Sequence, residues 1–336
     1  MMIFSRYALR VQLFLLALIL GFLLGPKAMQ AIAARDDAAP APAPAAIGTP
    51  LSETTVFLAK ERPSAYADVH LEAKSAYVWD ITARKKLYGT NDRAQLPLAS
   101  ITKMMMATVA RETLPSDAEV TIRAEDLLEE GDSGLAVGEI WNLSDLIDFT
   151  LISSSNDGAS ALATVAGATL GDPKPAPALA KRLFVKRMND KAKAIGLDDT
   201  FFMNESGLDV ESVTSGGYGS ARDVGMLFDY IWRKHPDLFR ATSEDRLSVT
   251  SRSGLRHHVA NTNAVVEEIT GIVGSKTGYT DLAGGNLAVV VDVGINHPVA
   301  IVVLGSTREG RFADVQTLAR ATVSAIGEPY LIVPAE

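Results

Sequence analysis

Hydrophobic and polar positions alternate as in β-strands near both ends of the chain and follow a helical period between them. Near the start, "AKSAYVWDITARKKLYG" (73–89) alternates as a β-hairpin does, with the turn near Thr82 to Lys86. Towards the end, "GIVGSKTGYT", "GGNLAVVVDVG" and "HPVAIVVLGST" (271–307) have the pattern of three strands. The last two are expected to form an antiparallel hairpin through Ile295 to His297.

The segments between these strands, and the end of the chain, carry the period of amphipathic helices. A helix is expected over Leu98 to Leu114, with Pro97 in the position that proline favours at a helix start. Residues 121–171 are expected to be mainly helical, with a polar break, "SSSN", at 153–156. Three further helices are expected over 180–197, 220–235 and 310–327.

This order of elements predicts an α+β fold. Strands gathered near both ends of the chain indicate one antiparallel sheet built from both ends. The helices between them are expected to flank this sheet and to form an inserted helical cluster.

The first 63 residues have a different character. Arg6 and Arg10 precede a short apolar run, Val11 to Leu24, and "AIA" at 31–33 has the pattern of a signal-peptidase site. Residues 1–34 are therefore expected to be a signal peptide or an uncleaved N-terminal membrane anchor. An Ala/Pro-rich tether is expected over 35–63 and the folded domain over 64–330. The expected location is the periplasm or cell-envelope exterior, or the inner membrane if the signal anchors the chain.

Composition narrows the function. The chain has 336 residues, a net charge of −8 and no cysteine. The acidic balance and the lack of a basic cluster argue against nucleic acid as a partner. Without cysteine there can be no disulfide, thiolate nucleophile or cysteine metal site.

Three short motifs suggest chemistry. Ser100 and Lys103 are three residues apart in "LPLASITKMMMATVA", so a helix would bring both onto one face among apolar residues. Alone, this spacing is more typical of a serine at a helix start and a partly exposed lysine than of a catalytic pair. The chain also contains a single Ser-x-Asn, Ser154 to Asn156, and a single Lys-Thr-Gly, Lys276 to Gly278. In this order the three motifs resemble the signature of serine β-lactamases and penicillin-binding proteins.

The chemistry explains why these residue types are needed. A serine hydroxyl is a poor nucleophile until a base takes its proton. Lys103 could be that base only if it is neutral, which requires burial or a second cation nearby. Lys276 could supply the cation and attract a substrate carboxylate.

The remaining motif residues suit the same reaction. Thr277 could donate a hydrogen bond to the carboxylate, and Gly278 would let the strand approach a ligand closely. Ser154 could relay a proton to a leaving amine, and the Asn156 amide could hold a substrate carbonyl. The backbone N–H groups of Ser100 and Tyr279 would form an oxyanion hole.

Beyond the motifs, the chain resembles the serine D-alanyl-D-alanine carboxypeptidase family, the low-molecular-weight penicillin-binding proteins. The resemblance extends from about Tyr77 to Ala325. It rests on "PLASITKMMMA", "LISSSNDGASALA", "MNDKAKAIGLDDTFFMNESGLD", "YGSARDVGML", "VANTNAVV", "GIVGSKTGYTDLAGGNLAVVV" and "STREGRF". It implies a β-lactamase/transpeptidase-like fold that hydrolyses peptidoglycan stem peptides and binds β-lactam antibiotics covalently, without a metal or cofactor.

The resemblance also implies a role for each motif residue. Ser100 would be the acylated nucleophile, Lys103 the general base and Ser154 the proton relay. Asn156 would be a substrate contact and Lys276 the carboxylate anchor.

Two features depart from the family. Gly158 stands where alanine is usual. The sequence also stops soon after the closing helix, so the C-terminal β domain and amphipathic membrane helix of many relatives are not expected. Shorter members cleave cross-links, and DD-endopeptidase activity is therefore the first alternative.

Two other functions would need features that the sequence does not provide. A β-lactamase would need a glutamate that activates water for deacylation. The candidates between the second and third motifs lie outside any segment like that class's glutamate loop, and they are Glu205, Glu211, Glu244, Glu267 and Glu268. An idle cell-wall-binding module would have no need of a neutral lysine beside a serine.

Two patterns are false leads. "GDSG" (131–134) looks like the nucleophile segment of trypsin-like proteases, but it falls in an expected helical region and is interpreted as a turn. His257 and His258 are neighbours, yet adjacent strand residues face opposite ways, so surface positions are expected rather than a metal site.

Overall fold

The computed structural model describes residues 64–131, 134–171 and 175–327. The chain divides into residues 1–60 and a compact unit over 61–336, to which every described element belongs. The expected signal or anchor (1–34), the tether (35–63) and the last expected domain residues (328–330) lie outside the described residues. In the ranges that are described, no helix is long and apolar enough to cross a membrane.

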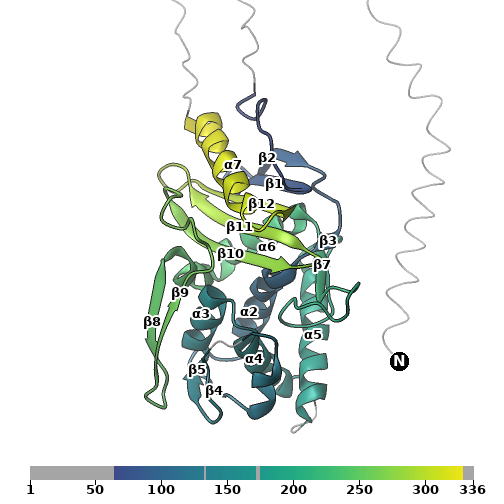
Figure 1. Cartoon of the computed structure of the whole chain (residues 1–336), viewed down its shortest axis with the longest axis vertical. Coiled ribbons are helices and arrows are strands. Elements are labelled where there is room, and N and C mark those ends of the chain that lie inside the picture. The colour runs from purple at the N-terminus through teal and green to yellow at the C-terminus, as the bar shows by residue number, and fades with distance from the viewer. Residues whose placement is uncertain (1–63, 132–133, 172–174, 328–336) are drawn as a thin grey trace, which may run out of the picture. The chain divides into compact units, whose positions relative to one another are not determined.

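A five-stranded antiparallel sheet contains strands from both ends of the unit, as predicted. Its order is β10-β11-β12-β1-β2, so the C-terminal strand β12 pairs with the N-terminal strand β1. The bounds are β1 (Ser75–Asp80), β2 (Lys85–Thr90), β10 (Ile272–Thr280), β11 (Gly284–Asp292) and β12 (Pro298–Ser306). The α+β fold class is confirmed (Figure 1).

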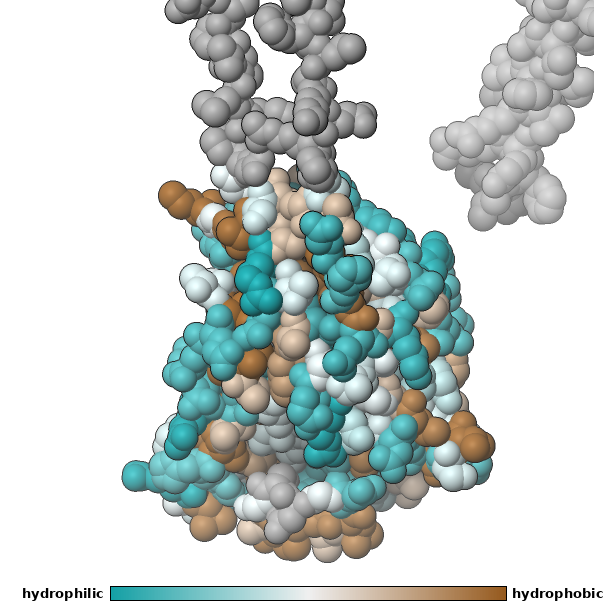
Figure 2. Space-filling model, turned by 45° about the horizontal axis from the view of Figure 1, so that its top comes forward, coloured by the Kyte–Doolittle hydropathy of each residue, from teal (hydrophilic) through white to brown (hydrophobic). Residues whose placement is uncertain are grey.

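The central strands are buried on both faces, since every residue of β12 is buried. One face packs Val289 and Ile301 against Val315 and Leu318 of α7 (Gly310–Gly327). The other face packs against α6 (Ala221–Lys234) and the helical cluster. Helices therefore cover both faces, and polar side chains predominate on the surface drawn in Figure 2, with hydrophobic side chains interspersed.

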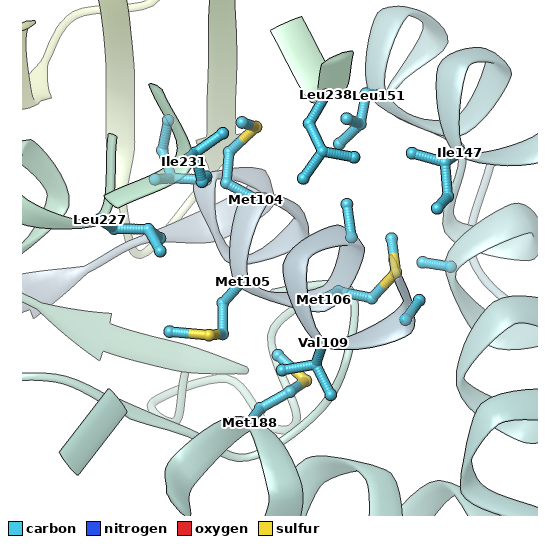
Figure 3. Packing of buried hydrophobic residues seen from close by; sticks show 14 of the residues in the cluster. Met104, Met105, Met106, Val109, Ile147, Leu151, Met188, Leu227, Ile231 and Leu238 are labelled. Atoms are coloured by element: carbon cyan, nitrogen blue, oxygen red, sulfur yellow. The ribbon is translucent and has the colours of Figure 1, made fainter. Parts of the chain in front are cut away.

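The helical cluster surrounds α2 (Thr102–Thr113). Residues 102–110 of α2 are all buried, so neighbours enclose this helix on every side. Met104, Met105 and Met106 point from it in different directions, and flexible methionine side chains can fill the irregular gaps between helices (Figure 3). The other helices are α3 (Leu143–Ser153), α4 (Asn156–Ala168) and α5 (Pro177–Ala194), with 3₁₀ turns η1 (Ala99–Ile101), η2 (Ala124–Leu128), η3 (Pro236–Phe239) and η4 (Ala241–Ser243).

Three small sheets were not predicted. Their strands are β3 (Leu96–Pro97), β7 (Gly217–Gly219) and β6 (Phe201–Phe202); β4 (Glu119–Thr121) and β5 (Ile140–Asn142); and β8 (Arg246–Thr250) and β9 (Arg256–Ala260). The β8–β9 hairpin had a signal in the sequence, because Leu247 and Val249 alternate with polar residues along β8, and in the structure partly buried and exposed residues alternate along both strands.

Two helix predictions were wrong in detail. Pro97 lies in β3 and pairs with Tyr218, and α2 begins only at Thr102 after the turn η1. The first part of 121–171 is not mainly helical: η2 and β5 lie in it, and β4 ends at Thr121. Its glycines explain this, because Gly131, Gly134 and Gly138 have positive φ values of 93°, 75° and 80°.

Candidate active site

Ser100 lies in the 3₁₀ turn η1, directly before α2. The turn opens with Ala99 at φ 47°, a left-handed conformation that is uncommon for a residue other than glycine. Asn286 of β11 is fully buried, and its Nδ2 donates to the carbonyl oxygens of Pro97 and Leu98, both at 3.0 Å. The sheet therefore holds the turn that carries Ser100.

Lys103 lies one helical turn after Ser100 and is completely buried. Its Nζ donates to Ser100 Oγ at 2.8 Å, Asn156 Oδ1 at 2.7 Å and the carbonyl oxygen of Ser206 at 2.9 Å. The contact expected from the spacing of Ser100 and Lys103 is thus present, and the amine does not reach out to solvent.

Burial lowers the pKa of Lys103 to about 7, and the carboxylates of Glu205 and Glu129 oppose the shift. Desolvation disfavours the charged form of a lysine because an apolar surrounding cannot replace its hydration. Near neutral pH a large fraction of Lys103 is therefore an amine with a free lone pair, 2.8 Å from the Ser100 hydroxyl oxygen.

The Ser-x-Asn motif lies at the break between α3 and α4. Ser154 ends α3 in the left-handed conformation at φ 61°, and Ser155 caps α4 by accepting a hydrogen bond from the Gly158 N–H. A Cβ at Gly158 would approach Thr150 Oγ1 to 2.2 Å. The unusual glycine thus allows α4 to pack tightly against α3, behind the loop that presents Ser154.

Lys276 lies in β10 and is also buried, with 1% of its surface exposed. Its Nζ donates to Ser154 Oγ at 2.9 Å and to the Thr277 carbonyl oxygen at 3.1 Å. Burial first, and then the charges of Lys103 and Arg311, hold the pKa of Lys276 well below its usual range. The sequence predicted that burial and Lys276 would both lower the pKa of Lys103. Burial does lower it, whereas the repulsion between the two lysines lowers the pKa of Lys276 instead.

The other two residues of the third motif face the same site. Thr277 Oγ1 lies 2.6 Å from Thr262 Oγ1, so these hydroxyls share a hydrogen bond. A Cβ at Gly278 would lie 2.7 Å from the Leu98 carbonyl oxygen and 3.2 Å from the Ser100 nitrogen. Only glycine allows the edge strand β10 to approach the nucleophile turn this closely.

Asn156 also contacts the buried lysine, which the sequence did not predict. Besides accepting from Lys103, its Nδ2 donates to the Glu130 carbonyl oxygen at 2.6 Å. The amide therefore orients Lys103, and a second N–H hydrogen remains for a substrate carbonyl. Beside it is a surface pocket of about 280 Å³, which is lined by Glu130, Gly131, Ser153, Ser154, Ser155, Asn156, Val259 and Ala260.

One glutamate candidate for deacylation is engaged in an ion pair, and the others are exposed to solvent. Glu205 is buried, but its carboxylate lies 3.5 Å from Lys181 Nζ, in an ion pair. The other candidates are exposed: Glu211, Glu244, Glu267 and Glu268.

The false leads are partly resolved. Asp132 and Ser133 of "GDSG" lie outside the described residues. His258 is exposed as expected, but His257 was wrongly expected at the surface: its side chain is 10% exposed and lies 2.6 Å from Glu139. Across the described ranges, no cluster of three histidine, aspartate or glutamate side chains is placed to hold a metal ion.

Comparisons with known proteins identify the family. A family described as D-alanyl-D-alanine carboxypeptidase matches residues 60–308 of this chain. The chain belongs to this family. It is therefore a serine-type DD-peptidase, a hydrolase, which confirms the family and enzyme class expected from the sequence.

Two curated relatives illustrate the range of the family. A D-alanyl-D-alanine endopeptidase of Pseudomonas aeruginosa is 32% identical over 80% of this chain and 84% of its own length. The D-alanyl-D-alanine carboxypeptidase DacF of Bacillus subtilis is 29% identical over 77% of this chain, which spans 66% of that relative.

Solved structures support the fold. A penicillin-binding protein homologue from Mycobacterium tuberculosis has a TM-score of 0.68 at 23% identity, covering 81% of this chain and 97% of its own. Penicillin-binding protein D2 of Listeria monocytogenes, solved in a cefotaxime-bound form, has a TM-score of 0.62 at 28% identity, covering 76% and 98%.

Several residues that shape the site were not predicted from the sequence. Thr262 was quoted only within "VANTNAVV", and Ser206 only within "MNESGLD". Asn286 and Arg311 were likewise quoted only within longer segments, and their contacts are with backbone carbonyl oxygens, which a sequence pattern does not reveal.

Proposed function

We propose that this protein is a D-alanyl-D-alanine carboxypeptidase that removes the terminal D-alanine of peptidoglycan stem peptides through an acyl-enzyme on Ser100. One observation carries the proposal: a fully buried lysine with a pKa of about 7 lies 2.8 Å from Ser100 Oγ. A general base works best when its pKa lies near the working pH.

In the acylation step, neutral Lys103 takes the proton of the Ser100 hydroxyl as Oγ attacks the carbonyl carbon. A C–O bond forms and the carbonyl electron pair moves onto oxygen, where the backbone N–H groups of Ser100 and Tyr279 stabilise the charge. The C–N bond then breaks and the departing nitrogen takes up a proton. Water later hydrolyses the ester, releases the shortened peptide and restores Ser100.

Ser154 would pass the proton to the leaving nitrogen. Its hydroxyl oxygen accepts a hydrogen bond from Lys276 at 2.9 Å, which leaves its own hydrogen free for a partner in the cleft. Lys276 and Thr277 then serve the substrate carboxylate, and the contact between Thr277 and Thr262 orients the hydroxyl.

Replacement of Lys276 tests the substrate class. A carboxypeptidase must recognise the free carboxylate of the terminal D-alanine, and a charge-assisted hydrogen bond is worth about 1.5–3 kcal/mol. At about 1.4 kcal/mol per tenfold, Lys276→Gln should lower acylation efficiency about tenfold to a hundredfold on carboxylate-bearing substrates and on penicillin. A substrate with an amidated carboxylate should lose much less.

The control is Lys186→Gln, which removes an exposed lysine paired with Asp190 on α5. If Lys276→Gln lowers acylation efficiency equally on the carboxylate-bearing and the amidated substrate, Lys276 does not bind the carboxylate. It would then act by lowering the pKa of Lys103 or by stabilising the fold. The carboxylate contact would then pass to Arg308, whose guanidinium lies 4.0 Å from the centre of the Tyr279 ring.

A second candidate function is DD-endopeptidase action on cross-links, supported by the 32% identity to the Pseudomonas aeruginosa endopeptidase. Mass analysis of muropeptides after incubation with the full chain separates the two. A carboxypeptidase releases D-alanine from pentapeptides and leaves cross-linked dimers intact, whereas an endopeptidase converts dimers to monomers. Neither product, in a preparation that penicillin still acylates, would refute both substrates.

We also propose that the protein works outside the cytoplasmic membrane, held there by residues 1–34 or released after their cleavage. The support is the charged and apolar pattern of Arg6, Arg10 and Val11 to Leu24, together with a substrate class that lies in the cell wall. Mass analysis of the protein recovered from the envelope tests this, since cleavage after Ala33 would shorten the chain by a defined mass.

A further inference from the structure

A buried arginine contacts the strand that carries the third motif. Arg311 lies in the first turn of α7, with 8% of its surface exposed, and its Nη1 donates to the Gly278 carbonyl oxygen at 2.8 Å. Its guanidinium also lies over the Phe312 ring, 4.7 Å from the ring centre, and Glu309 is the carboxylate whose negative charge favours the charged form of Arg311. A buried charge is costly unless it is paired, so this guanidinium acts on the carbonyl it contacts.

The hydrogen bonds of β10 show in which direction the backbone N–H of Tyr279, the residue after Gly278, points. Successive backbone groups of a strand point to opposite sides, and β10 is an edge strand with β11 on one side only. The Ser275 N–H donates to Thr242 Oγ1 at 3.1 Å and so faces away from β11. By alternation the Tyr279 N–H also faces away from β11, on the edge that approaches Ser100.

The Gly278 carbonyl and the Tyr279 N–H belong to one planar peptide unit and point in opposite directions. A cation that binds the oxygen draws electron density from the nitrogen and makes the N–H a stronger donor. It also fixes the plane of the peptide. Arg311 thus binds the carbonyl oxygen of this peptide, while the N–H at the other end of the same peptide dipole faces the cleft.

The other expected oxyanion donor, the backbone N–H of Ser100, is held by the same part of the sheet. Asn286 pairs with Gly278 in the β10–β11 register, and its Nδ2 holds the carbonyl oxygens of Pro97 and Leu98 just before Ser100. The positions of the Tyr279 N–H and the Ser100 N–H are therefore both set by the paired residues Gly278 and Asn286 of strands β10 and β11.

We propose that Arg311 is a positioning residue for the oxyanion hole: it orients and polarises the Gly278–Tyr279 peptide so that the Tyr279 N–H binds the developing oxyanion more strongly. The inference rests on the proposed function, in which this N–H is one of the two oxyanion donors. Arg311 does not touch the substrate and acts only through the peptide.

The test compares the full-length protein with Arg311→Gln, which removes the charge, and with Arg311→Lys, which keeps it. Arg320→Gln is the matched control, since Arg320 is exposed on the same helix. Two quantities are measured with a penicillin labelled at the lactam carbonyl: the acylation rate constant separated from initial binding, and the infrared stretching frequency of the acyl-enzyme carbonyl.

Arg311→Gln should slow acylation about tenfold, less than the about 10²–10³-fold known for complete loss of an oxyanion donor, because the N–H remains in place. Initial binding should be unchanged, and the carbonyl band should move to higher frequency because the oxyanion hole polarises it less. Arg311→Lys should restore part of both effects, and Arg320→Gln should match the unaltered protein. If Arg311→Gln does not fold, Arg311→Lys is used instead. A shift of its carbonyl band to higher frequency supports the proposal, and an unchanged band contradicts it.

An unchanged carbonyl band would overturn the proposal, even if acylation slowed. That result would mean that Arg311 acts through the nearby Lys276, or only through stability. Failure of the proposed function is a separate outcome, because the unaltered protein would then form no acyl-enzyme on Ser100 at all.

Discussion

Ser100→Ala is expected to abolish covalent labelling by penicillin completely. The acyl-enzyme needs an oxygen nucleophile, and Ser100 Oγ is the hydroxyl that the buried amine of Lys103 contacts. In the unaltered protein the adduct should persist for minutes or longer, because Glu205 is engaged by Lys181 and the other candidate glutamates are exposed, so none is expected to activate water for its release. Intact-mass spectrometry after incubation with penicillin measures both the adduct and its decay.

Ser144→Ala is the matched control, since Ser144 lies at the start of α3 and its hydroxyl donates only to the Ser116 carbonyl oxygen. It should label as the unaltered protein does. An adduct of undiminished amount on Ser100→Ala would refute the assignment of the nucleophile. Rapid turnover of nitrocefin by the unaltered protein would instead indicate a β-lactamase. If penicillin did not label the unaltered protein at all, an idle cell-wall-binding module would be indicated.

Lys103→Arg is expected to slow acylation by about 10²–10⁴-fold, the usual contribution of a general base. A guanidinium keeps its proton throughout the accessible pH range and cannot take one from Ser100. In the unaltered protein the rate should rise with pH as Lys103 loses its proton, with a midpoint near its pKa of about 7, and then level off. A rate still rising steeply towards about pH 10, where a free lysine titrates, would exclude Lys103 as the base.

Protein stability gives an independent check on the same pKa. The folded state holds Lys103 with a pKa of about 7, below the ordinary value of 10.5 that applies to the unfolded chain. Between these values the unfolded chain binds more protons, so the contribution of Lys103 to the unfolding free energy becomes more favourable as pH rises. Relative to the unaltered protein, Lys103→Met should therefore gain more stability at pH 7 than at pH 9. An equal gain at both would mean an ordinary pKa.

The local patterns of the chain predicted much of the fold. The helix expected over 310–327 forms as Gly310–Gly327, and the three strands expected over 271–307 form in the predicted antiparallel order. These elements bury one or both faces, so their apolar residues recur with the period of the element itself. The prediction failed for 121–142, where pairing between β4 and β5 and glycines of positive φ override helical propensity.

The site was predictable as a set of residue types but not as a set of contacts. The sequence alone determined the three motifs, their order, and the contact between Ser100 and Lys103, because a three-residue spacing places both on one helical face. Tertiary structure decided which residues meet across the fold. Lys276 and Ser154 are 122 positions apart, yet their side chains are 2.9 Å apart.

Tertiary structure also decided the chemistry of the two lysines. Apolar neighbours in the sequence cannot show whether a lysine reaches water, whereas packing of α2 inside the helical cluster excludes water from Lys103 and lowers its pKa. Asn286 and Arg311 act through backbone carbonyl oxygens, which every residue has, so no side-chain pattern could reveal them. The sequence determined which groups are present, and the fold determined their solvation and their partners.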